Sequence, residues 1–187
     1  MQRSTSTALA AILAQPGRQA LAAPGRNGIE LARLSAQRSD EGVLLSYEVR
    51  FDLSRDIEQA LYKGLSVVFV AEAEVHKNRW YWTDQVVATA TRRWRLAYQP
   101  LTRQWRLSFD GLSRHYSRLS EVLEVLRHGI QWRIADALPA NDSEDYYVDF
   151  VFKLDTSELP RPMQFGLGGQ SDWDLIVQRR TSVPLPR

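Results

Sequence analysis

The segment VVATATRRWRLAYQPLTRQWRL, residues 86 to 107, contains the longest two-residue alternation in the chain. Apolar side chains recur at alternate positions: Val86, Ala88, Ala90, Trp94, Leu96 and Tyr98. Polar side chains fill positions between them: Thr89, Thr91, Arg93 and Arg95. Because successive side chains of a β-strand point to opposite faces, this pattern predicts a long strand with one face on the core. Arg92 is the one charge on the apolar face.

The end of this segment predicts a β-hairpin. Residues 98 to 103, YQPLTR, have the proline and polar residues of a turn, and the apolar alternation resumes in residues 104 to 109. Matching WRL triplets begin at Trp94 and Trp105 on the two arms. We therefore expect both tryptophans to be core residues.

The preceding residues predict a second hairpin, a helix and a strand. Residues 29 to 51 alternate around a turn that contains Gly42, a residue suited to a positive φ. A short helix should follow, with Ser54 capping its first-turn amides and Gly64 ending it. The expected buried stripe of this helix is Ile57, Ala60 and Leu61. A strand is expected over residues 67 to 75.

The following residues predict a second helix and further strands. The helix should begin at Ser117 and end at His128–Gly129. The strands are expected at residues 132 to 135, 146 to 154 and 175 to 178. Since short turns rather than crossover helices join most strands, we predict an α+β fold. Its main part is an antiparallel β-sheet with two short helices packed on it, or a sandwich-like arrangement closed by the helices.

The chain has 187 residues, 44% of them apolar and 25% charged, which is a globular composition. We expect one globular domain over residues 28 to 180. Residues 1 to 25 are predicted to be a signal peptide or a disordered leader, and residues 181 to 187 a C-terminal tail.

The leader decides the predicted location. Residues 7 to 14 are mostly apolar and Ala20–Ala22 resembles a cleavage site, but QPGR at residues 15 to 18 interrupts the apolar stretch. We expect a periplasmic or envelope-associated protein if the leader directs export, and a cytoplasmic one otherwise. No apolar run approaches the roughly 20 residues of a membrane-spanning helix, so no transmembrane segment is expected in the mature chain.

Charge and composition argue against several classes of function. The pI of about 9.0 suggests an anionic partner, but Arg3 and Arg18 of the leader account for the whole basic excess. A nucleic-acid partner is therefore not expected. The chain has no cysteine, and its three histidines, His76, His115 and His128, lack metal-site spacing. We expect no metal, no cofactor and no recognisable catalytic residue.

Glu72 and Glu74 resemble a carboxylate pair, because they lie on one face of a predicted strand. Two roles are open to them. They could be catalytic carboxylates, or they could pair across strands with the arginines of the central hairpin. The second role is favoured, with Arg93, Arg95 and Arg106 as the expected partners.

The segment HKNRWYWTDQ, residues 76 to 85, carries the candidate binding residues. They are Arg79, Trp80, Tyr81, Trp82 and Asp84. The segment connects two predicted strands, and connections lie at the surface, so some of the rings should anchor to the core and others remain exposed. Exposed aromatic residues beside an arginine are typical of protein-interface hot spots, so the expected partner is an envelope protein.

These residues also carry a resemblance. Arg79–Trp82, Leu96–Tyr98 and Leu101–Arg103 are similar to motifs of the proteobacterial family called domain of unknown function 4390, and the similarity spans roughly residues 28 to 180. The resemblance implies an exported protein, since family members usually start with a signal peptide, and their genes often lie beside that of a membrane sensor kinase. It implies no catalytic residue.

Two classes of function remain open. The first is a non-catalytic envelope module that binds a protein or envelope polymer and is linked to envelope signalling. The alternative is an enzyme that acts on an envelope substrate through unrecognised carboxylates, with Glu72 and Glu74 or Asp172 and Asp174 as candidates. The lack of a nucleophile–base or metal motif favours the first class.

Overall fold

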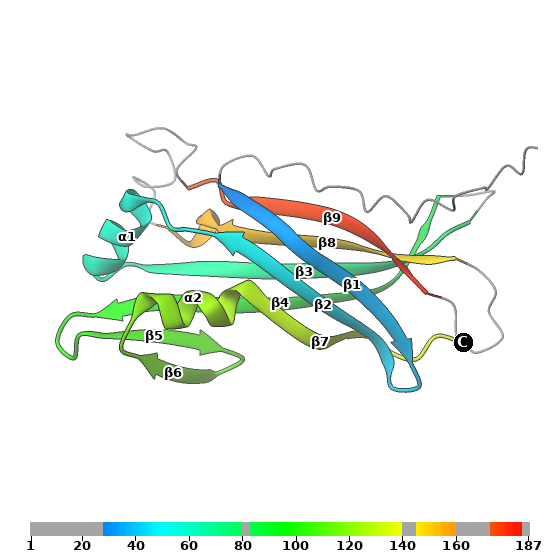
Figure 1. The fold of residues 1–187 in the computed structure, drawn as a ribbon, viewed down its shortest axis with the longest axis horizontal. Helices are drawn as coiled ribbons and strands as arrows, with labels where there is room; N and C mark the ends of the chain where they lie inside the picture. Colours follow the sequence, from blue (N-terminus) through cyan, green and yellow to red (C-terminus); the bar gives the residue numbers. More distant parts are fainter. Residues whose placement is uncertain (1–27, 80–82, 140–144, 160–172, 185–187) are drawn as a thin grey trace, which may run out of the picture.

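The computed structural model describes residues 28–79, 83–139, 145–159 and 173–184, so the predicted leader lies outside the described residues. The described residues form two antiparallel β-sheets and two α-helices (Figure 1). In chain order the elements are β1 (Ile29–Ser39), β2 (Gly42–Phe51), α1 (Arg55–Tyr62), β3 (Ser66–Lys77), β4 (Gln85–Gln99), β5 (Gln104–Phe109), β6 (Leu112–Tyr116), α2 (Leu119–Arg127), β7 (His128–Ala135), β8 (Tyr146–Asp155), the 3₁₀ helix η1 (Thr156–Glu158) and β9 (Ile176–Val183).

The two sheets form the layers of a sandwich. The smaller sheet has the strand order β1-β2-β7, and the larger has the order β6-β5-β4-β3-β8-β9. In Figure 1 the smaller sheet crosses over the larger one, and α2 lies over β5. All strand pairs in both sheets are antiparallel. The α+β prediction is confirmed, and the two sheets take the sandwich-like form.

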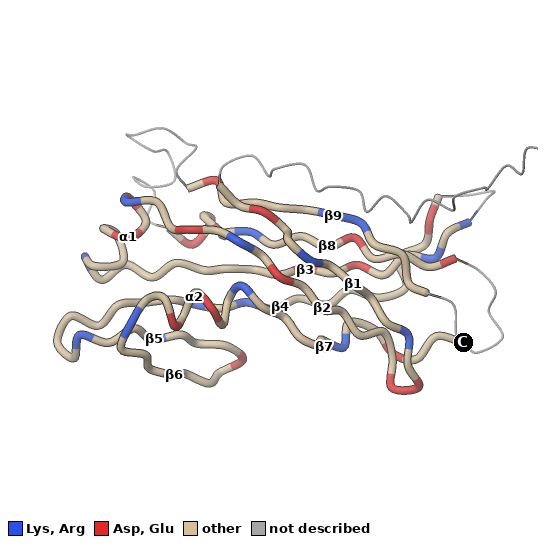
Figure 2. Tube along the Cα trace, in the orientation of Figure 1, with Lys and Arg blue, Asp and Glu red and all other residues tan. Residues whose placement is uncertain are grey.

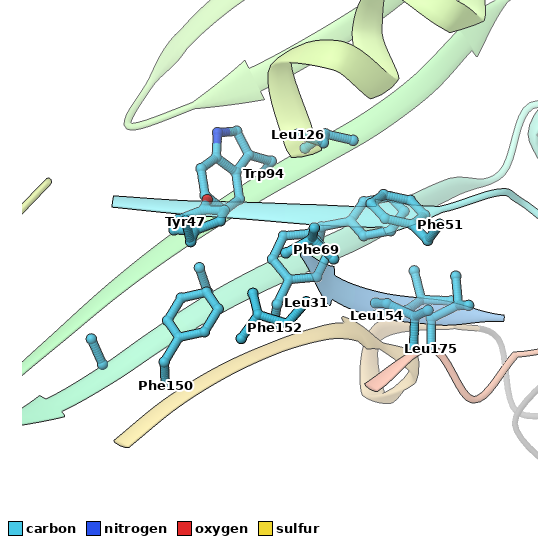
Figure 3. Close-up of a cluster of buried hydrophobic side chains, with 14 of the residues drawn as sticks. Leu31, Tyr47, Phe51, Phe69, Trp94, Leu126, Phe150, Phe152, Leu154 and Leu175 are labelled. Atoms are coloured by element: carbon cyan, nitrogen blue, oxygen red, sulfur yellow. The ribbon is translucent and has the colours of Figure 1, made fainter. Parts of the chain in front are cut away.

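Aromatic side chains from both sheets fill the space between the layers (Figure 3). Tyr47 of β2 contacts Phe150 of β8, with ring centroids 4.8 Å apart. Phe51 of β2 lies 5.4 Å from Phe69 of β3 and 5.6 Å from Phe152 of β8. These five rings are almost fully buried, so they hold the smaller sheet against the centre of the larger one.

The central hairpin forms as predicted, and Trp94 and Trp105 are both buried. The register pairs Leu96 with Leu107, so the two WRL triplets run past each other in opposite directions. Each tryptophan therefore lies opposite another aromatic residue: Trp94 faces Phe109, and Trp105 faces Tyr98.

Gly42 begins β2 with a φ of 137°, which confirms the expected positive φ in the β1–β2 turn. The structure adds a second reason for glycine at this position. A Cβ atom on Gly42 would lie 2.2 Å from the carbonyl oxygen of Ala135 in β7. The turn therefore needs glycine both for its backbone angle and for the close approach of the third strand.

Helix α1 also agrees with the sequence prediction. The Ser54 hydroxyl accepts a hydrogen bond from the Ile57 amide at 3.3 Å, and this bond satisfies a free first-turn donor. The buried residues of α1 are Ile57, Ala60 and Leu61. Neither helix of the described residues is long and apolar enough to cross a membrane.

The predicted ends of α2 are wrong. The helix begins at Leu119 after Arg118, and Ser117 does not cap it. It ends at Arg127, and His128 is already extended, with φ −122° and ψ 129°. Gly129 therefore does not close the helix. It is a residue of β7, next to Tyr47 on β2.

Three further strand boundaries differ from the prediction. β6 was not predicted, because most of its residues are exposed and give no apolar alternation. β7 begins four residues earlier than expected, and Gln131, at φ 46°, interrupts its alternation. β9 continues to Val183, which pairs with Tyr146 and is 7% exposed. β9 thus continues past residue 180, the predicted end of the domain.

Candidate functional site

The candidate binding residues lie in the connection between β3 and β4. Trp80, Tyr81 and Trp82 are outside the described residues. Arg79 and Asp84 flank them, and the Arg79 amide donates to Asp84 Oδ1 at 3.3 Å. The Arg79 guanidinium also donates to the Gln85 side chain. These two bonds join the ends of the connection where it leaves and re-enters the sheet.

Asp84 is also fixed to the sheet by Tyr147 of β8. The Tyr147 hydroxyl donates to Asp84 Oδ2 at 2.6 Å, past the one strand, β3, that separates β4 from β8. This bond is the main reason why the pKa of Asp84 lies below its usual range, and it raises the pKa of Tyr147. Both directions describe one arrangement, a protonated phenol on an ionised carboxylate.

Tyr147 is held by residues from the strand on each side. The His76 ring of β3 stacks on it, with centroids 4.8 Å apart and an angle of 7° between the planes. The Arg180 guanidinium of β9 lies 3.9 Å from its ring centroid. A cation and a parallel ring both interact favourably with an aromatic face. The stack therefore restrains the side chain that holds Asp84.

Carboxylates complete this group of side chains. Arg180 forms a bidentate pair with Asp149, with both nitrogen–oxygen distances at 2.8 Å, and this pairing lowers the pKa of Asp149. His76 Nε2 lies 3.4 Å from a Glu74 oxygen and 3.6 Å from an Asp149 oxygen. This buried nitrogen makes no hydrogen bond to any described residue.

We call these residues the Tyr147 cluster: Glu74, His76, Asp84, Tyr147, Asp149 and Arg180. They lie on the face of the larger sheet that points away from the smaller sheet, since their neighbours Val75 and Val148 are buried in the core. Figure 2 shows basic positions on β9, and both acidic and basic positions on β3 and β8. A cavity of about 420 Å³ borders the cluster beside Asp149 and Arg180. No group of three metal-ligating side chains is found in the ranges that the structure describes.

The predicted ion pairs across the strands exist, but the predicted partners are wrong. Glu72 pairs with Lys153 of β8 at 3.0 Å. Arg93 pairs with Asp155 at 2.7 Å and with Glu158 at 3.0 Å, and Glu158 also binds Arg95. The register explains the difference. Arg93 and Arg95 lie opposite valines of β3, while the two glutamates lie opposite threonines.

The ion pairs at η1 predict a specific acid response. Hydrogen bonds from Ser157 and from Arg93 lower the pKa of Asp155 below its ordinary 3.8. A carboxylate whose pKa is lower in the folded than in the unfolded protein stabilises the fold at pH values above the unfolded-state pKa. This stabilisation is lost as the pH falls through the folded-state pKa. We expect the free energy of unfolding to fall less steeply in Asp155→Asn than in wild type between about pH 5 and about pH 2.5.

Urea unfolding at several pH values measures this difference. Asp40→Asn is the control, because Asp40 is an exposed carboxylate in the β1–β2 turn. Its pH profile should follow that of wild type. Parallel profiles for Asp155→Asn and wild type would contradict the role assigned to Asp155.

Sequence reasoning missed Tyr147, Asp149 and Arg180. The only available signal was their position on the polar side of predicted or partly predicted strands. That β8 lies between β3 and β9 depends on pairing between distant segments, which periodicity does not specify. The structure brings no support to the carboxylate pairs considered as catalytic residues. Glu72 is neutralised by Lys153, and Asp172 is outside the described residues.

Comparison with known proteins identifies a family. The family model described as Domain of unknown function (DUF4390) matches residues 26–182, which is most of the chain. No curated protein and no solved structure shows significant similarity. The matched range contains β1 to β8 and all of β9 except its last residue, Val183, and it includes the whole Tyr147 cluster. The chain therefore belongs to the DUF4390 family.

Proposed function

We propose that the protein is a non-catalytic binding module of the cell envelope, located in the periplasm, that contacts a protein partner through residues 79 to 84. The observation that carries this proposal is the fixed base of the β3–β4 connection. Asp84 accepts hydrogen bonds from Tyr147 and from the Arg79 amide, and Tyr147 is itself held between His76 and Arg180.

A fixed base favours binding because less conformational entropy is lost when the partner docks. The sequence of the connection supplies Arg79 and three aromatic residues, and arginine, tryptophan and tyrosine dominate interface hot spots. The adjacent cavity beside Arg180 offers room for a partner side chain. The leader sequence and the family's usual signal peptide support the envelope location.

The pairing of charges favours binding over the alternative enzyme. A general base needs a carboxylate or imidazole that is free to accept a proton from substrate. In the Tyr147 cluster, Asp84 is bound by a phenol and an amide, and Asp149 by a bidentate guanidinium. Tyr147 keeps its proton because its pKa is raised. These bonds leave neither Asp84 nor Asp149 free to act as a general base.

Alanine variants of Arg79, Trp80, Tyr81 and Trp82 test the proposal. The partner is first identified as the protein that wild type retains in a pull-down from the envelope fraction. The thermal stability of each variant and the amount of this partner that it recovers are then measured. We expect at least one ring and Arg79 each to cost roughly 2 kcal/mol or more of binding, with a much smaller loss of folding stability. Leu101→Ala is the matched control, since Leu101 is fully exposed at the opposite end of β4.

The control should recover the partner as wild type does. If every variant that loses the partner also loses stability in proportion, the connection is structural and the proposal fails. Detection of the protein only in the cytoplasmic fraction would contradict the envelope location.

A further inference from the structure

A partly buried arginine lies on the core side of the larger sheet, away from the Tyr147 cluster. Arg92 pairs in register with Ala71, a fully buried residue of β3, so its side chain points between the layers. Its Cζ atom lies 4.9 Å from the ring centroid of Trp132 and 5.8 Å from that of Phe109. The guanidinium is thus flanked by aromatic rings from both sheets.

Arg92 forms no ion pair with any acid in the described part of the chain. Burial is the main reason why its pKa is lowered. Buried guanidinium groups are usually paired with an anion, because the cost of removing the charge from water is otherwise uncompensated. Cation–π contacts offset part of this cost, but they leave the N–H donors of the fork available.

Tyr47 places a second unused donor in the same region. Its side chain is 3% exposed, and its hydroxyl has no hydrogen-bond partner among the residues that the structure describes. Arg92 packs on Trp132, and Trp132 lies opposite Leu45, two residues before Tyr47 on the same face of β2. Burial raises the pKa of Tyr47, and the charge of Arg92 acts in the opposite direction. A buried hydroxyl without a partner is costly, which makes it a ready donor to an incoming acceptor.

An apolar row leads from the core to the surface beside Arg92. Cross-strand neighbours form this row: Phe69, Trp94, Phe109 and Leu112. Phe69 is fully buried, whereas Phe109 is 36% and Leu112 75% exposed. β5 ends at Phe109, opposite Trp94, so Arg92 has no cross-strand partner in β5. The row therefore offers an exposed apolar path that ends at a cation.

We propose that Arg92 and Tyr47 bind the carboxylate of a fatty-acid-like molecule whose alkyl chain lies along Phe109 and Leu112. The planar fork of Arg92 matches a carboxylate in a bidentate geometry, and the Tyr47 hydroxyl supplies a further donor. The carboxylate gives the guanidinium the anion that the described residues do not provide. The alkyl chain covers apolar surface that is otherwise exposed to water.

Calorimetric titration of the full chain with octanoate tests this site. Acetate carries the same carboxylate without the alkyl chain, and octanol carries the alkyl chain without the charge. We expect octanoate to bind at least about tenfold more tightly than either, because each lacks one of the two contacts. Equal affinity for octanoate and octanol, or no binding of octanoate, would overturn the proposal.

Variants locate the site. Arg92→Met should weaken octanoate binding by about tenfold or more, and Tyr47→Phe should weaken it by a smaller factor. Arg95→Met is the matched control, since Arg95 is on the same strand but on the opposite face and pairs with Glu158. Its octanoate affinity should equal that of wild type.

Thermal melting without ligand shows whether each variant is folded. If Arg92→Met does not fold, Arg92→Lys replaces it, because lysine keeps the charge and lacks the bidentate fork. The octanoate affinity of Arg92→Lys should be lower than that of wild type. Unchanged octanoate affinity in both Arg92→Lys and Tyr47→Phe contradicts the assignment, as does an equal loss of affinity in Arg95→Met.

Discussion

Trp94→Ala and Trp105→Ala should each lower the free energy of unfolding by about 3–5 kcal/mol, the usual cost of removing a large buried aromatic side chain. The Trp94 side chain is 6% exposed and the Trp105 side chain 3%. The Trp94 ring lies 5.5 Å from the ring of Phe109. The Trp105 ring contacts two others, Tyr98 at 4.9 Å and Tyr62 of α1 at 5.4 Å. Alanine removes these contacts and leaves a cavity that the two-layer core closes only in part.

Equilibrium unfolding in urea measures the effect. The control is Leu101→Ala in the β4–β5 turn, because Leu101 is fully exposed and its truncation should change the free energy of unfolding little. Wild-type stability in either tryptophan variant would mean that the register of β4 and β5 is shifted by one residue. Such a shift would move both rings to the opposite face of the sheet.

Gly129→Ala should destabilise the fold by about 3 kcal/mol, the upper end of the usual range for overpacking. A Cβ atom at this position would lie 2.1 Å from Cε1 of Tyr47 and 2.6 Å from two further atoms of the same ring. The ring cannot withdraw easily, because it also contacts Phe150 in the centre of the core. The methyl group therefore has to displace either the tyrosine or the backbone of β7.

A double-mutant cycle with Tyr47→Leu identifies the cause. If the clash is with the tyrosine ring, Gly129→Ala should cost at least about 1 kcal/mol less in the Tyr47→Leu background than in wild type. Gly111→Ala is a matched control. Gly111 has a φ of 75°, and no heavy atom of the described structure lies within 4 Å of the added Cβ. Its cost should be limited to backbone strain, about 1–2 kcal/mol. Identical losses in both backgrounds would contradict the explanation.

Most of the architecture could be predicted from periodicity. Ser54, Gly42 and the alternating segments act locally, so the helix cap, the first turn and the main strands agree with the structure. The prediction errors occur where a contact between residues distant in the sequence determines the local structure. Gly129 after α2 resembles a helix terminus, but its lack of a side chain is required by Tyr47, a residue of a distant strand. β6 has no buried alternation because it is an exposed edge.

The candidate site could be predicted only in part, for the same reason. Arg79 and Asp84 are recognisable as neighbours of an aromatic connection, and the structure does join them. That Asp84 would bind Tyr147 follows from the pairing of β3 with β8, and the alternation of apolar residues does not specify which strands become neighbours. Likewise, Arg92 was recognisable as the one charge on an apolar face, while its position between Trp132 and Phe109 depends on how the sheets cross.

The place of β3 at the centre of the larger sheet has a consequence for how the chain reaches its native state. β3 pairs on one side with β4, which follows directly, and on the other with β8, which is synthesised only after two further strands, a helix and β7. Until β8 emerges, the valine-rich edge of β3 has unpaired amides and carbonyls, the feature that promotes intermolecular strand addition. Non-local pairing of this kind also slows folding. A newly made chain therefore passes through an aggregation-prone interval whose length is set by the arrival of β8, and a chaperone that covered β3 during that interval would raise the yield of native protein.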